Sequence, residues 1–290
     1  FSHPSDGACM TQWEERISGS SDVLVLGEHQ ARYGWVRRVI DEATTWCDLG
    51  CGTGAASSRA LGDVLPENVV LIDVEPDALE EARRAFAPSP VRTAQVDLTS
   101  TAELAELASQ LEATPGPLVI TCFEVIEHLV DLGPLVEWLG RRSQDGATVA
   151  ISVPNDVFTS VKNPFHLTMW GSSTVEELRG LLPDPHVVAV QAALSGSVVT
   201  DGTSVSFTGI VEDATSVVPL QYLMGFGPSA DRLAPNAVVL TTDIAAQRVW
   251  ERQREVDNAY YRAMAARVPE LEARIAELEA RSDSTGAASR

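Results

Sequence analysis

A regular alternation of short apolar runs and longer amphipathic stretches is the feature that most constrains this chain. Between residues 45 and 153 the apolar runs are TWCDL, VVLID, TAQVDL, PLVITCF and ATVAISV. The stretches between them, such as TAELAELASQLEA and GPLVEWLGRRS, have the spacing of helices that bury one face. Consecutive parallel strands need a crossover connection, and a helix of this length supplies one. The sequence therefore predicts an α/β domain with a doubly wound, mostly parallel sheet and helices on both faces.

The segments that flank this alternation complete the predicted architecture. Residues 29–43 have helical spacing and predict an N-terminal helix. The runs 186–194 and 204–211, joined by a Gly-containing turn segment, predict a hairpin whose last strand is antiparallel, in a sheet of about seven strands. Residues 219–235 are rich in Gly and Pro and predict an irregular connection.

The C-terminal part has a helical pattern of its own. Apolar residues from Tyr261 to Leu278 alternate in steps of three and four, and Pro269 interrupts the register. This pattern fits a short coiled coil that forms a homodimer, and it equally fits a helix packed on its own domain. We divide the chain into a lead, a main domain, an irregular connection, a helical extension and a disordered tail: residues 1–28, 29–218, 219–240, 241–281 and 282–290.

Composition argues against several classes of function. The 290 residues carry 21 basic and 41 acidic side chains, a formal net charge of −20. A surface this acidic repels phosphate backbones, so we do not expect nucleic acid as the main partner. No apolar run reaches the roughly 18 to 20 residues that cross a bilayer. The four cysteines form no CxxC pair, which favours a reducing compartment, and we expect a cytoplasmic location.

The sharpest local signal is DLGCGTG, residues 48–54, which follows the first apolar run. Its glycines permit a tight strand-to-helix turn and let a ligand approach the backbone. The loop alone does not select one ligand, because Gly50, Gly52 and Ala55 also satisfy the dinucleotide pattern GxGxxA. Asp73 and Asp97 end the next two runs, so they would join the loop at the crevice where open α/β sheets bind ligands. There Asp73 could accept hydrogen bonds from ribose hydroxyls.

This ordered set of motifs resembles the class I S-adenosylmethionine (SAM)-dependent methyltransferases, which have a Rossmann-like fold. WCDLGCGTG is similar to their first motif, LIDVEPDALEEAR to their second and AQVDL to their third, and the resemblance extends over residues 30–212. The resemblance implies that Asp48 and the backbone of Gly50 and Gly52 contact the methionine end of SAM and that Asp73 contacts the ribose. It also implies that Asp97 and Leu98 contact the adenine and that Phe123 borders the sulfonium. The implied cofactor-binding residues are Asp48, Gly50, Cys51, Gly52, Asp73, Val74, Asp97, Leu98 and Phe123. A nucleotide-dependent dehydrogenase is the less favoured interpretation.

The segment FEVIEHL, after the fourth run, supplies candidate catalytic and metal-binding residues. Glu124, Glu127 and His128 are spaced i, i+3 and i+4, which places them on one face of a helix. His128 would serve as a general base, since the unperturbed pKa of imidazole lies near neutrality. His166 could complete a set of two carboxylates and two imidazoles that suits Mg²⁺ or another divalent cation. Alternatively, Glu124 and Glu127 only stabilise the helix through a favourable interaction with its dipole, and His128 only packs nearby.

Three functions are compatible with these residues. The favoured one is an enzyme that transfers a methyl group from SAM to a hydroxyl of a small molecule, such as a sugar, a glycan precursor or a secondary metabolite. NPFHLTMW and VEELRGLL resemble segments of bacterial methyltransferases of glycan and natural-product pathways. The second is a metal-dependent RNA 2′-O-methyltransferase, because ExxEH with a later His resembles the small-RNA 3′-terminal enzymes, although the net charge opposes it. The third is a non-catalytic SAM-binding protein whose C-terminal helix serves assembly.

Overall fold

The structure is a computed structural model, and it describes residues 23–157, 163, 165–183, 187–192 and 219–233. From Val25 onward these residues belong to one compact unit of the chain. The predicted helical extension 241–281, the tail 282–290 and most of the lead 1–28 lie outside the described residues.

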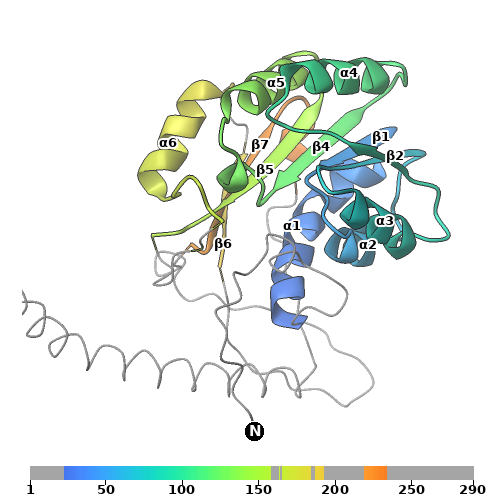
Figure 1. The fold of residues 1–290 in the computed structure, drawn as a ribbon, viewed down its shortest axis with the longest axis horizontal. Helices are drawn as coiled ribbons and strands as arrows, with labels where there is room; N and C mark the ends of the chain where they lie inside the picture. Colours follow the sequence, from blue (N-terminus) through green and yellow to red (C-terminus); the bar gives the residue numbers. More distant parts are fainter. Residues whose placement is uncertain (1–22, 158–162, 164, 184–186, 193–218, 234–290) are drawn as a thin grey trace, which may run out of the picture. The chain divides into compact units, whose positions relative to one another are not determined.

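A mixed sheet forms the middle layer, in the order β3-β2-β1-β4-β5-β7-β6 (Figure 1). The strands are β1 (Thr45–Leu49), β2 (Asn68–Asp73), β3 (Arg92–Gln95), β4 (Leu118–Phe123), β5 (Thr148–Pro154), β6 (Val187–Gln191) and β7 (Gln221–Phe226). Strands β1 to β5 pair in parallel, whereas β7 is antiparallel to both β5 and β6. The predicted doubly wound, Rossmann-like sheet is confirmed.

The register of the parallel strands sets the position of the site. Leu49, the last residue of β1, lies level with Ile72 of β2 and Cys122 of β4. The chain proceeds from β1 to β2 and β3 on one side and then returns to β4 on the other. The segments that leave β1 and β4 therefore diverge, and they open a crevice at the carboxyl ends of these strands.

Helices cover both faces of the sheet (Figure 1). One face packs against α1 (Val23–Asp41), α2 (Ala55–Leu61) and α3 (Pro76–Ala85), and the other packs against α4 (Thr101–Glu112), α5 (Gly133–Gln144) and α6 (Ser172–Leu181). Their sequences explain where they begin: Pro76 occupies the first turn of α3, and the Ser100 hydroxyl accepts a hydrogen bond from the Glu103 amide at the start of α4. The short 3₁₀ helices η1 (Ile126–His128) and η3 (Ala230–Arg232) follow β4 and β7.

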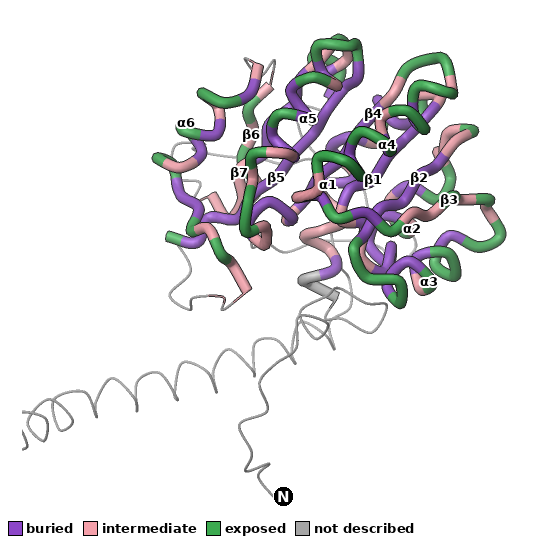
Figure 2. The backbone as a smooth tube through the Cα atoms, turned by 45° about the horizontal axis from the view of Figure 1, so that its top comes forward, coloured by how far each residue is buried: buried purple, intermediate pink, exposed green. Residues whose placement is uncertain are grey.

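The central strands are buried on both faces, as Figure 2 shows for β1, β4 and β5. Cys47 and Leu49 face the layer of α4, α5 and α6, whereas Trp46 faces the layer of α1, α2 and α3. Burial on both faces is why these strands are almost continuously apolar in sequence. Among the described residues, no helix is both long and apolar enough to cross a membrane.

The antiparallel edge corrects the sequence-based prediction. Strand β6 lies within the run 186–194, but its partner is β7, which lies inside the segment 219–235 that was predicted to be irregular. Leu223, Met224 and Phe226 are buried between the neighbouring elements, and this burial outweighs the Gly and Pro content of the segment. The run 204–211, the other half of the predicted hairpin, lies outside the described residues.

Helix α1 begins earlier than predicted, at Val23, so the predicted boundary between residues 28 and 29 falls inside it. Leu26 is buried and continues the apolar face of Val36 and Ile40 toward the N-terminus. Gly27 obscured this extension in the sequence, because glycine is a weak helix former.

Candidate active site

A cleft of about 510 Å³ opens at the carboxyl ends of β1, β2 and β4. It brings together every predicted site residue except Asp48. The predicted residues that line it are Gly50, Cys51, Gly52, Asp73, Val74, Asp97, Leu98, Phe123, Glu124, Glu127, His128 and His166. Their convergence follows from the strand register, since all of them lie at or beyond the same edge of the sheet.

The glycine loop is held in a shape that side chains rarely permit. Gly50, Gly52 and Gly54 have φ angles of 67°, 55° and 67°. A Cβ atom on Gly50 would lie 2.4 Å from Val125 Cγ2, whereas one on Gly52 would meet nothing within 4 Å. Gly50 is therefore required by packing, and Gly52 leaves open space beside the cleft in which a ligand fits.

Asp73 fastens this loop to the end of β2. Its Oδ2 accepts a hydrogen bond from the Gly52 amide (2.9 Å), and its Oδ1 accepts one from the Glu75 amide (3.0 Å). The carboxylate is 5% exposed and lines the cleft. A carboxylate oxygen can accept more than one hydrogen bond, so these contacts are compatible with the predicted binding of ribose hydroxyls.

Asp97 lies two residues beyond the end of β3 rather than at its last residue. Its Oδ1 accepts hydrogen bonds from the Thr99 hydroxyl (2.7 Å) and the Thr99 amide (2.8 Å), and these bonds lower the pKa of its carboxyl group. Asp97 thus stabilises the turn before α4 and also lines the cleft beside Leu98.

Asp48 lies beneath the cleft and is 1% exposed. Its Oδ1 accepts a hydrogen bond from the Thr121 hydroxyl (2.5 Å), and its Oδ2 accepts one from the Tyr33 hydroxyl (2.9 Å). Thr121 in turn accepts a hydrogen bond from Trp46 Nε1 (2.8 Å). Burial raises the pKa of Asp48 to about 7, although the two hydroxyl donors lower it. In this structure Asp48 positions Tyr33, and its predicted contact with the methionine end remains a prediction.

Tyr33 connects α1 to the cleft. It lines the cleft and packs edge-to-face on Phe123, with ring centroids 5.3 Å apart. Burial and the neighbouring Asp48 hold the pKa of its phenol well above the usual range. Trp35, on the same helix, is buried in the core of the layer formed by α1, α2 and α3. The helical spacing of Tyr33 with Val36 and Ile40 was the only sequence signal for this contact.

The segment FEVIEHL does not form the predicted α-helix. Glu124 has a φ angle of 55°, which an α-helix excludes, and only Ile126–His128 form a 3₁₀ turn. The Glu124 amide continues the sheet by donating to the Ser152 carbonyl (3.3 Å), and its Oε1 accepts a hydrogen bond from the Ser152 hydroxyl (2.7 Å). Glu124 therefore turns toward β5, away from the shared helical face that the spacing predicted.

Glu127, His128 and His166 form a compact cluster at one end of the cleft. One ligand atom from each lies within 4.8 Å of the other two, a separation that a single metal ion could bridge. The imidazole rings are 5.1 Å apart between centroids and inclined at 77°. Among the described residues Glu124 is not part of this group, so the structure brings together three of the four predicted ligands.

The cluster is electrostatically strained. Glu127 is 1% exposed, and its Oε2 has no hydrogen-bond donor among the described residues. Burial, together with the nearby Glu124, raises the pKa of Glu127 well above its usual range. A buried carboxylate oxygen without a donor costs free energy, which a bound cation would offset.

Arg32 is a buried cation that lowers the pKa of both Glu127 and Glu28, against the larger opposite effect of burial. It is 1% exposed, and its Nη1 donates to Gln191 Oε1 (2.9 Å). The Gln191 amide group donates to the carbonyl of Glu28 (2.8 Å). The edge strand β6 therefore holds the part of α1 that covers the cleft.

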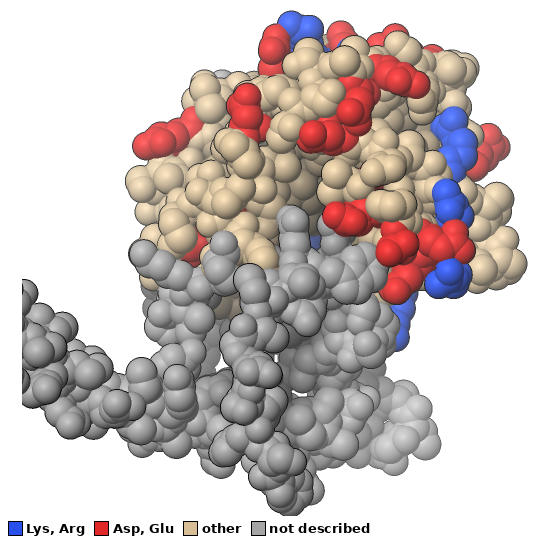
Figure 3. Space-filling view, viewed as in Figure 1, with Lys and Arg blue, Asp and Glu red and all other residues tan. Residues whose placement is uncertain are grey.

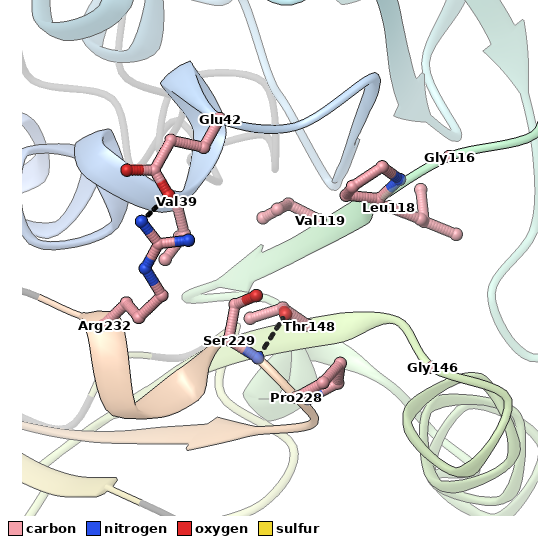
Figure 4. Close-up of a pocket in the computed structure, with 11 residues that line it drawn as sticks. Val39, Glu42, Gly116, Leu118, Val119, Gly146, Thr148, Pro228, Ser229 and Arg232 are labelled. Atoms are coloured by element: carbon pink, nitrogen blue, oxygen red, sulfur yellow. Dashed lines mark hydrogen bonds and ion pairs between the residues drawn. The ribbon is translucent and has the colours of Figure 1, made fainter.

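A second cavity, of about 340 Å³, lies at the opposite edge, beside the amino ends of β4 and β5 (Figure 4). Its charged side chains, Glu42 and Arg232, form an ion pair with each other. The Ser229 amide donates to the Thr148 hydroxyl (3.2 Å). None of the predicted site residues lines this cavity in the part of the chain that the structure describes, so we assign the site to the larger cleft.

Comparison with known protein families identifies the class of protein that this fold and cleft define. Residues 28–187, more than half of the 290, match the family described as methyltransferase domain (Methyltransf_23). The chain belongs to this family of class I SAM-dependent methyltransferases. SAM is the methyl donor that the family implies, and the cradle at Gly52, with the acid at the end of β2 and the acid after β3, fits it.

Solved structures with a similar fold have low identity to this chain. The methyltransferase domain of bacterial CtHen1 is 21% identical, with 69% of this chain and 100% of that chain covered and a TM-score of 0.44. The N-methyltransferase NodS from Bradyrhizobium japonicum is 15% identical, with 71% and 98% covered and a TM-score of 0.45. No curated protein matches the chain.

Replacing Gly52 by Ala should separate cofactor binding from stability. The left-handed backbone at φ 55° costs an alanine about 1 kcal/mol, while the added methyl group enters the open space of the cleft. We expect the affinity for S-adenosylhomocysteine, measured by calorimetry, to fall at least about tenfold. Gly146→Ala is the matched control, because Gly146 also has positive φ and open space but does not line the cleft. Equal affinities in the two variants would contradict this assignment of Gly52.

Replacing Asp48 by Asn should change the pH dependence of stability. With a folded pKa of about 7 and an unfolded pKa near 4, Asp48 is protonated more readily in the folded state. The contribution of Asp48 to the free energy of unfolding is fully present at low pH and is lost as the pH rises through 7. This loss lowers the free energy of unfolding by about 2–4 kcal/mol. Asn cannot ionise and can still bond both hydroxyls.

Urea unfolding at pH 5 and pH 8 measures this effect. The wild-type protein should lose more stability between the two pH values than Asp48→Asn, whereas Asp145→Asn, an exposed change, should follow the wild type. The same pH slope in Asp48→Asn and the wild type would show that Asp48 does not titrate in this range.

Proposed function

We propose that this protein transfers the methyl group of SAM to a hydroxyl of a small acceptor, such as a sugar, a glycan precursor or a secondary metabolite, with a divalent metal held by Glu127, His128 and His166. The observation that supports the metal is the three-residue cluster, in which a buried carboxylate lies beside two imidazoles at the end of the cleft. Two nitrogens and one oxygen are a donor set that suits Mn²⁺, Fe²⁺, Co²⁺ or Zn²⁺ better than Mg²⁺.

The hydrogen bond of His128 leaves one ring nitrogen available for either of its two predicted roles. His128 Nδ1 lies 3.1 Å from the carbonyl oxygen of Phe165, which cannot donate a proton, so Nδ1 carries the proton and Nε2 has the lone pair. That lone pair can accept a proton or bind a metal, but not both at once. The nearby Glu127 and His166 favour the metal, and His128 remains the candidate general base if no metal binds.

An O-methyl acceptor fits this cluster better than an amine. SAM supplies an already activated methyl group, so the protein has to align the acceptor and facilitate removal of its proton. A bound divalent cation lowers the pKa of a hydroxyl. Glu124 lines the cleft, and its carboxylate accepts a hydrogen bond from the Ser152 hydroxyl, so we assign it as the candidate that receives the proton.

The alternative functions are weaker. For RNA, the net charge is unfavourable, and on the face shown in Figure 3 acidic side chains are interspersed with a few basic ones. Retention on an RNA column at moderate salt would support it. For a non-catalytic SAM-binding protein, the complete cleft is the opposing observation. The homodimer through residues 241–281 and the cytoplasmic location remain predictions.

Glu127→Gln should remove metal binding without unfolding the protein, because Gln is isosteric and removes a buried charge. We expect the affinity for Mn²⁺, measured by electron paramagnetic resonance, to fall at least about 100-fold, since loss of a ligand exceeds the effect of losing a supporting residue. Affinity for S-adenosylhomocysteine should stay within about twofold. Glu137→Gln, in an exposed ion pair with Arg141 on α5, is the matched control.

Activity provides the second test. Labelled methyl transfer from SAM to a panel of hydroxylated sugars and phenols should stop after exhaustive chelation and return on addition of Mn²⁺. Transfer that is unaffected by chelation would eliminate the metal, and a large loss in His128→Ala under those conditions would then assign His128 as the base. Transfer only to amines would overturn the O-methyl proposal.

A further inference from the structure

Asp156 is a buried carboxylate in the segment that delivers His166. It follows β5 by two residues and is 7% exposed. Its Oδ1 lies 2.7 Å from His166 Nδ1, and its Oδ2 accepts a hydrogen bond from the Trp170 amide (2.9 Å). The Asp156 amide also donates to the Trp170 carbonyl (2.9 Å), so Asp156 closes the base of the loop in which His166 lies.

This contact determines which nitrogen of His166 can bind a metal. An ionised carboxylate only accepts hydrogen bonds, so His166 Nδ1 carries a proton, and in the neutral imidazole Nε2 then has the lone pair. The Phe165 carbonyl imposes the same tautomer on His128. Both imidazoles of the cluster are therefore prepared to act as ligands through the same ring atom, an arrangement typical of histidines that bind metals.

The loop is also hydrogen-bonded directly to η1. The amides of Leu167 and Thr168 donate to the carbonyl of Glu127, at 2.7 Å and 3.3 Å. The residues after β4 and the residues after β5 therefore form one hydrogen-bonded unit. His166 is not placed by chance contact of two surface segments, because backbone and side-chain bonds fix it from both sides.

We propose that Asp156 is the positioning residue of the metal site, which holds His166 in the tautomer and orientation that binding requires. This inference rests on the metal that the proposed function includes. Asp156 acts through His166 and has no assigned contact with the acceptor or with SAM.

Asp156→Asn is the decisive variant, because asparagine has one acceptor where aspartate has two. If the amide oxygen accepts from Trp170, the amide NH₂ faces His166, which must then accept at Nδ1 and carry its proton on Nε2. That tautomer cannot bind a metal through Nε2. We expect the affinity for Mn²⁺ to fall about 10- to 100-fold, with affinity for S-adenosylhomocysteine unchanged. Asp63→Asn, in an exposed ion pair with Arg37, should bind Mn²⁺ as the wild type does.

Nitrogen-15 NMR of the histidine rings provides a readout that a purely structural role would not change. In the metal-free wild-type protein His166 should show the Nδ1–H tautomer, and in Asp156→Asn it should show the Nε2–H tautomer. A wild-type protein with the Nε2–H tautomer at His166 would overturn the inference, even if the variant does not fold. Wild-type affinity for Mn²⁺ in a folded Asp156→Asn protein would also overturn it. Absence of Mn²⁺ binding to the wild type would instead refute the metal of the proposed function, while the tautomer would still test the contact between Asp156 and His166.

Discussion

The parallel alignment of β1, β2 and β4 is the constraint on which the site depends. Their ends lie within one residue of one another in register, so each following segment begins at the same edge. The glycine loop, the acid that fastens it and the η1 turn come from segments about 75 residues apart in sequence, yet they line one cleft. No single side chain creates this convergence. The backbone hydrogen bonds of the sheet do so, and the site residues use the positions that result.

Local sequence patterns predicted the parallel strands correctly, and with them the site residues whose positions are set by the ends of those strands. The strands near Asp48, Asp73 and Phe123 could be recognised because burial on both faces makes them continuously apolar. Once the strands were recognised, the cleft residues could be predicted as well, because the carboxyl ends of parallel strands share one edge of the sheet. Spacing alone failed at Glu124, where a hydrogen bond to the distant Ser152 selects a left-handed backbone in place of a helix.

Long-range contacts account for what the sequence did not reveal. Strand β7 was not recognised, because its pairing with β5 and β6 depends on residues far away in the chain. Asp156 was not recognised either, although an acid two residues after a buried strand and ten residues before a histidine is a usable signal. Asp48 illustrates a third case, in which a residue of the expected type at the expected position faces a tyrosine beneath the cleft.

The way β6 holds α1 has a consequence for the limits of the catalytic unit. The family match ends at residue 187, where β6 begins, so Gln191 and the whole of β7 lie beyond it. Shortening the chain to the matched region would uncover the flank of β5 and remove the contacts of Gln191 with Arg32 and with the Glu28 carbonyl on α1. The folded unit therefore extends past the residues that match the family and includes a sheet edge that the family match leaves out.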